Sequence, residues 1–180
     1  MLLFTIRQIY HVLKGMKSPQ MVRNKRLEVP FRCMPYDLDL FMHMNNASYL
    51  RLAELARWRM VGSSGMAESD LFRKGNILFL AVENKVKYLR QVPPFQRLIV
   101  TLSCDVYKDN KWIYMRHKFE QHPDTVKSGQ EPRLFADVEC RAVFKKRNGQ
   151  TIKPSELVEM HPHLKELCTV HDEDKEVVDW

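Results

Sequence analysis

Apolar side chains occupy almost the whole circumference of one predicted helix, which runs from Ala47 to Val61. They are Tyr49, Leu50, Leu52, Ala53, Leu55, Ala56 and Met60. A helix of this kind is buried rather than laid on a surface. Asn45 or Asn46 can cap its start, because an Asn side chain accepts the free backbone N–H groups there. The glycines and serines at 62–65 are expected to end it.

After this helix the apolar residues alternate with polar ones, which is typical of half-buried strands. The predicted strands are 27–34, 77–90, 97–107, 112–120 and 134–144. Most of the strands follow the single buried helix, and this order indicates the α+β class with an antiparallel sheet. A helix that is apolar all round must then be wrapped by that sheet.

A second helix is predicted at the N-terminus, where apolar residues repeat at helical spacing. These residues are Leu2, Leu3, Ile6, Ile9, Tyr10 and Leu13, and Arg7 and Lys14 lie off the stripe. Such a helix could be a mitochondrial presequence, which is amphipathic and basic. It could also lie on an anionic membrane surface, or it could pack on the domain.

These patterns divide the chain into a targeting or membrane-surface segment at 1–26, a folded domain at 27–165 and an acidic tail at 166–180. The division predicts that deletion of residues 1–24 leaves folding and any hydrolase activity intact. The same deletion is expected to remove either attachment to a membrane surface through residues 2–17 or import into mitochondria. The protein is accordingly expected to be mitochondrial or membrane-associated within the cell.

The 180 residues have a formal net charge of +7, and the charge is unevenly distributed, with a basic N-terminal segment and an acidic C-terminal tail. A nucleic-acid partner is not expected, because the aromatic residues fall in strand patterns and not on a basic stripe. The four cysteines include no C-x-x-C pair, so no metal site is expected. There is no glycine-rich phosphate loop, and no cofactor is expected.

The segment leading into the buried helix, residues 37–50, is the richest in reactive side chains. Its candidates are Asp37, Asp39, His43, Asn45 and Asn46. A helix N-terminus offers free N–H groups and a partial positive charge, which can stabilise a thioester oxyanion. A carboxylate on the same loop could act as nucleophile or general base. The same residues could equally serve as turn and capping groups alone.

This segment resembles the motif of the hydroxybenzoyl-CoA thioesterase group of the hotdog superfamily. The matching residues are Asp39, His43, Asn45, Asn46, Tyr49 and Leu50, followed by Glu54, Ala56 and Arg57. It is especially similar to the eukaryotic thioesterase superfamily member six proteins, and also to the plant acyl-carrier-protein thioesterases. The resemblance implies a single hotdog fold.

The resemblance also implies hydrolysis of a fatty-acyl or aryl thioester, delivered by CoA or by a carrier protein. Asp39 matches the family's catalytic Asp, with Asp37 and Glu54 as secondary candidates. Many members have Gly where this chain has Met42, and Gly allows a close approach of backbone to ligand. This departure and the basic N-terminal helix motivate the alternative of an acyl-CoA-binding protein with little or no turnover.

Two further expectations concern ligand and assembly. Lys85, Lys87 and Arg90 lie on or after the first long strand and could contact CoA phosphates, although such residues are commonly a solvated strand face. A sheet wrapped around one helix leaves edge strands open to pairing. Hotdog domains dimerise across such an edge, so a homodimer or a dimer of dimers is expected, with the site at the subunit junction.

Overall fold

The computed structural model describes residues 2–17, 22–23, 25–69, 72, 74–108 and 110–172. Its helices are α1 (Leu2–Met16), α2 (Asn46–Ser63), α4 (Pro154–Met160) and α5 (Pro162–Leu167). Its strands are β1 (Val22–Arg23), β2 (Arg26–Arg32), β3 (Ile77–Tyr88), β4 (Arg97–Tyr107), β5 (Trp112–Gln121), β6 (Leu134–Lys146), β7 (Thr151–Ile152) and β8 (Cys168–His171). Short 3-10 turns lie at Pro35–Asp37, Met66–Glu68 and Pro123–Thr125.

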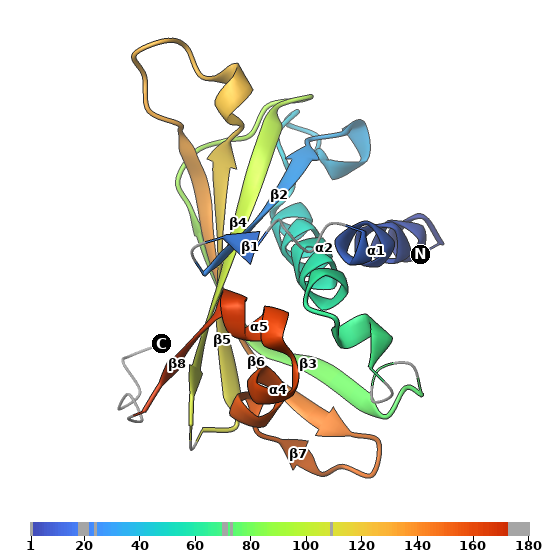
Figure 1. The fold of residues 1–180 in the computed structure, drawn as a ribbon. Helices are drawn as coiled ribbons and strands as arrows, with labels where there is room; N and C mark the ends of the chain where they lie inside the picture. The colour runs from blue at the N-terminus through green and yellow to red at the C-terminus, as the bar shows by residue number, and fades with distance from the viewer. Residues whose placement is uncertain are drawn as a thin grey trace.

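One sheet forms the frame of the molecule, with the strand order β1-β2-β4-β5-β6-β3 and antiparallel neighbours throughout this path. β7 is antiparallel to β6, and β8 runs parallel to β4. α2 lies between this sheet and α1 (Figure 1). The predicted α+β class and hotdog arrangement, a curled antiparallel sheet around one central helix, are confirmed.

The alternation of the strands produces this arrangement. On β4, the side chains of Leu98, Val100, Leu102, Cys104 and Val106 are buried. The opposite face of the sheet holds charged pairs between strands, including Arg116 with Asp137, and Arg141 with Glu83 at 2.8 Å. The apolar face therefore packs on α2 and the charged face lies outside.

β3 is an edge strand, since it pairs with β6 alone among the strands of the described chain. Its side chains Leu78, Leu80 and Val82 are 42%, 43% and 52% exposed. Unpaired edges with exposed apolar side chains are templates for pairing with another strand. β3 thus presents an open edge with exposed apolar side chains.

α1 packs directly on α2, which is the third of the three arrangements that the sequence left open. The backbones touch at Gly15 and Gly62: a Cβ at Gly62 would lie 2.1 Å from the carbonyl oxygen of Val12. The glycines and serines at 62–65 were expected to end α2, and the helix does end within them, at Ser63. Gly65 follows with a φ of 75°, which suits glycine. Because α1 covers α2, the boundary near residue 27 does not separate two independent structural units.

The other boundary also differs from the expectation. β8 lies within the segment assigned to the acidic tail, and it pairs with β4. Lys25 donates hydrogen bonds from Nζ to the carbonyl oxygens of Lys165 (2.7 Å) and Cys168 (3.1 Å), so it closes the C-terminal end of α5. The acidic residues from 173 onward lie outside the described residues.

Candidate active site

The N-terminus of α2 is capped by Asn45, whose side-chain oxygen accepts a hydrogen bond of 2.8 Å from the N–H of Ala47. The backbone N–H of Asn45 donates to the carbonyl of Asp37 at 2.8 Å. Asn46 is the first helical residue, and within the described part of the chain its N–H finds no acceptor. The sequence left the choice of cap open, and the structure assigns the cap to Asn45 and an unused N–H donor to Asn46.

Asp39 organises the loop in front of this helix. Its Oδ1 accepts hydrogen bonds from the N–H groups of Phe41 (2.9 Å) and His43 (3.3 Å). Its own N–H donates to the carbonyl of His43 at 2.8 Å. No hydrogen bond to Oδ2 exists among the described residues, so one oxygen of this carboxylate holds the loop and the other is available for chemistry.

Met42 occupies the position at which many members of the hotdog thioesterase family that this segment resembles have glycine. Its φ is 60°, the left-handed conformation that glycine adopts without strain. Its N–H donates to the carbonyl of Asp39 at 3.2 Å, and its side chain is 59% exposed. The loop therefore keeps a glycine-type backbone despite the methionine, and the side chain does not line the cleft described next.

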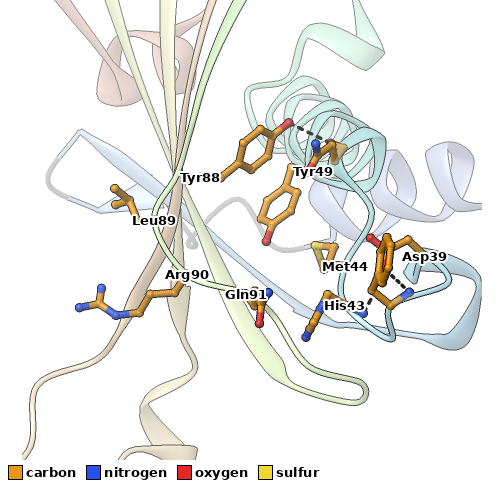
Figure 2. A pocket seen from close by; sticks show the side chains of 10 residues that line it. Asp39, His43, Met44, Tyr49, Tyr88, Leu89, Arg90 and Gln91 are labelled. Carbon is orange, nitrogen blue, oxygen red and sulfur yellow. Dashed lines mark hydrogen bonds between the residues drawn. The ribbon is translucent and has the colours of Figure 1, made fainter.

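A cleft of about 700 Å³ opens between this loop, α2 and the end of β3 (Figure 2). Its lining residues are Asp39, Phe41, His43, Met44, Asn46, Tyr49, Tyr88, Leu89, Arg90 and Gln91. A smaller cleft of about 270 Å³ shares His43 and Gln91 with the first, and its remaining lining includes Gln121 and Arg133. The two hollows therefore adjoin, one rich in aromatic side chains and the other in amides.

Tyrosines form one wall of the larger cleft. The rings of Tyr49 and Tyr88 meet edge to face at 5.2 Å, and Tyr49 meets Phe119 at 5.3 Å. The Tyr88 hydroxyl donates to the carbonyl of Asn46 at 3.4 Å. Burial raises the pKa of Tyr49 to about 12, with the neighbouring Cys33 and Tyr88 adding to the effect, so its hydroxyl stays protonated at neutral pH.

Asp37 does not line either cleft. It is 1% exposed, its Oδ2 accepts from the N–H of Met34 at 3.1 Å, and its Oδ1 lies 3.7 Å from Arg7 of α1. Burial raises the pKa of this carboxyl, while the Met34 N–H and the charges of Arg7 and Arg51 act in the opposite direction. Asp37 therefore supports the loop instead of facing a substrate.

Glu54, the other secondary candidate, is also outside both clefts. Its Oε1 accepts from the side chains of Gln8 (2.7 Å) and Trp58 (3.4 Å). This carboxylate ties α1 to α2, which is a structural use of the residue.

The three basic ligand-binding candidates separate in the structure. Arg90 lines the larger cleft, and its Nη1 donates to the carbonyl of Leu134 at 3.0 Å. Lys85 and Lys87 alternate with Tyr88 along β3, and their cross-strand neighbours are Glu139 and Asp137 on the outer face. Neither lysine lines a cleft, because successive side chains of a strand point to opposite faces.

Several lining residues were not foreseen from the sequence as site residues. Tyr88, Gln91, Gln121 and Arg133 come from strand ends that lie far apart along the chain. The strand pairing brings them together, and no local spacing marks them. Among the described residues, no cluster of His, Cys, Asp and Glu could hold a metal ion.

Comparison with known proteins agrees with the fold. The model of the thioesterase-like superfamily matches residues 33–167. The chain is 33% identical over 88 residues to Protein THEM6 of Drosophila melanogaster, covering 48% of this chain and 44% of that protein. It is 32% identical over 78 residues to the long-chain acyl-CoA thioesterase FadM of Escherichia coli, covering 42% and 55%. The chain thus matches about half the length of these curated relatives.

A solved structure shows the same architecture. A 1,4-dihydroxy-2-naphthoyl-CoA thioesterase from Synechocystis superposes with a TM-score of 0.63 at 12% identity. The superposition covers 79% of this chain and 97% of the other. At this identity the likeness concerns the fold.

Proposed function

Because the chain belongs to the thioesterase-like superfamily, we propose that it hydrolyses an acyl-CoA thioester to the free acid and CoA. The observation that supports this most is the meeting of Asp39 and the first N–H of α2 at one cleft. FadM is named as a long-chain acyl-CoA thioesterase, and the aromatic cleft wall favours an apolar acyl group here as well. A carrier-protein thioester has the same reacting bond and remains within the proposal.

The chemistry follows from the two groups. The N–H of Asn46 stands at the positive end of the α2 dipole, where a donor stabilises the oxyanion that forms on the thioester carbonyl. Oδ2 of Asp39 either removes a proton from the attacking water or attacks the carbonyl itself. In both routes the C–S bond breaks, the thiol leaves and water supplies the oxygen of the acid. His43 holds the carboxylate in place through its backbone N–H.

The alternative of binding without turnover was motivated by Met42 and by the basic N-terminal helix. Since the loop keeps its left-handed backbone and the methionine side chain is exposed, the first of these motives is removed.

The test is an acyl-CoA panel with detection of free thiol, comparing wild type with Asp39→Asn. An amide oxygen can still accept from Phe41 and His43, so this variant keeps the loop and removes the charge. Loss of a general base lowers kcat by roughly 10²–10⁴-fold, and we expect a fall in this range with KM little changed. Asp172→Asn, at a side chain 83% exposed, is the matched control and should behave as wild type. Full activity of Asp39→Asn would exclude the assignment.

We also propose a homodimer formed through β3. The exposed apolar side chains of this edge support it, and the cleft lies at the end of the same strand, at Tyr88. A second chain paired there would border the cleft. A mass of 21.4 kDa, that of one chain, by light scattering at micromolar concentration would contradict the proposal.

A further inference from the structure

The outer face of α1 is apolar and exposed to solvent. Leu2 is 76% exposed, and Leu3, Ile6, Ile9, Tyr10 and Leu13 are between 52% and 55% exposed. All of them belong to one helix of 15 residues and share one side of it. Contiguous apolar surface of this kind on a soluble protein marks an interaction site.

The inner face of α1 has the opposite character. It holds Gly15, which touches the backbone of α2, and His11, whose Nδ1 accepts from Arg59 Nη2 at 3.2 Å. Gln8 donates to Glu54 at 2.7 Å. A helix that only covers a domain places its apolar stripe inward. Phe4 also packs against the core from this side. The large apolar side chains of the outer face make no such contact, so they are left for another partner.

The charges around the stripe are all positive. Lys14 and Lys17 are exposed, and Nζ of Lys14 lies 5.5 Å from the ring centroid of Tyr10. The first 27 residues contain no Asp or Glu. An apolar stripe flanked by lysines is complementary to a partner that has an apolar interior beneath an anionic outer layer.

We propose that the outer face of α1 docks the protein on an anionic lipid bilayer, with the helix lying in the plane of the interface. Apolar side chains enter the acyl boundary, and the lysines meet the headgroups. None of the described helices is long and apolar enough to cross a bilayer. A second copy is a poorer occupant, because pairing two such faces would bring lysines together with no acidic partner on α1.

Docking would place the bilayer next to the candidate site. Arg7 lies on the flank of α1, 3.7 Å from Asp37, and its guanidinium is 5.2 Å from the ring centroid of Tyr36. Both partners immediately precede the loop that Asp39 organises in front of α2. α1 is also part of the packed structure, which favours a retained docking helix over a presequence that is removed on import.

The test is flotation of the full chain with vesicles of phosphatidylcholine, with and without phosphatidylserine. Each apolar side chain of the outer face would lose its remaining water-exposed surface on entering the acyl boundary. We therefore expect Ile6→Gln, Ile9→Gln and Leu13→Gln together to reduce vesicle binding at least ~100-fold. Met160→Gln changes an apolar side chain that is 52% exposed on α4, and it should float as wild type. The wild type should bind the anionic vesicles more strongly, and added salt should weaken this difference.

Lys14→Gln with Lys17→Gln forms the second arm, which leaves the apolar stripe intact. It should lower binding to the anionic vesicles and leave binding to phosphatidylcholine unchanged. Equal flotation of the triple variant and wild type would overturn the proposal, as would no wild-type flotation with anionic vesicles. A triple variant that changes only the mass in light scattering would also overturn it, in favour of an interface between copies.

Discussion

Addition of one methyl group at the crossing of α1 and α2 tests how firmly α1 belongs to the domain. In Gly62→Ala the new Cβ would lie 2.1 Å from the carbonyl oxygen of Val12, and in Gly15→Ala it would lie 2.5 Å from that of Arg59. Both obstacles are helix backbone, which cannot move alone. Either substitution therefore forces the two helices apart by a substantial fraction of an ångström or more.

The magnitude follows from three contributions. Overpacking costs about 1–3 kcal/mol, while Ala in place of Gly in a helix returns about 1 kcal/mol. Separation of the helices also weakens the hydrogen bonds from Arg59 to His11 and from Gln8 to Glu54, worth about 1 kcal/mol each. We expect a net loss of about 2 kcal/mol in the free energy of unfolding, and thus a Tm lower by roughly 4–8 °C.

The assay is thermal unfolding followed by circular dichroism at one protein concentration, with the two single variants and the double variant side by side. The two methyl groups obstruct the same crossing, so the second should cost little once the first has displaced α1. The double variant should be about as stable as the weaker single variant. A single variant that melts above wild type would show that α1 does not need this contact, and fully additive losses would show that the two sites are independent.

Two further predictions concern charge. Burial and then the neighbouring Arg59 lower the pKa of His11 to about 3, so the unfolded chain binds its proton near pH 6.5 while the folded chain stays neutral. The stability that this neutral imidazole contributes is present above pH 6.5, and it falls by about 1 kcal/mol between pH 7 and 5.5. Urea unfolding of His11→Gln should therefore show a smaller loss in the free energy of unfolding over this pH range. An unchanged pH dependence in the variant would contradict the assignment. Arg90→Ala should raise KM for acyl-CoA by roughly tenfold, as expected when a hydrogen bond to a charged group is lost. Lys87→Ala should leave KM unchanged, because Lys87 lies on the outer face of the sheet. Equal effects of the two substitutions in steady-state kinetics would refute a role of Arg90 alone in binding CoA.

The fold was accessible from the sequence because its signals are local. The alternation at 97–107 coincides with β4, and the helix predicted from Ala47 to Val61 lies within α2. Each pattern reports which face of one element is apolar, and a single sheet around one helix satisfies all of them. The candidate loop was accessible for the same reason, since its reactive side chains stand in one short segment, and the resemblance singled out Asp39 within it.

The remainder of the site depends on pairing between distant segments. Tyr88 and Gln91 reach the cleft because β3 ends beside α2, and Arg133 reaches the smaller cleft ahead of β6. Register of this kind has no local signature. The strand spacing of Lys85 and Lys87, in contrast, already allowed the solvated face on which the structure places them. The orientation of α1, like that register, could not be predicted. Apolar periodicity suggests that the apolar stripe faces inward, whereas the close backbone contact at Gly15 lets the opposite face pack on α2.

The loop before α2 explains how a strained backbone and a reactive carboxylate can occupy the same few residues. A non-glycine residue in the left-handed conformation costs about 1–2 kcal/mol, and Met42 adopts it at a φ of 60°. The hydrogen bonds from Phe41 and His43 to Oδ1 of Asp39 offset this cost, so the charge that would act on a thioester also holds the loop that presents it. Removal of the whole side chain would disturb both roles, whereas an amide would disturb only one. The difference in residual activity between Asp39→Ala and Asp39→Asn therefore measures the structural share of this residue, and the activity still missing from Asp39→Asn measures the chemical share.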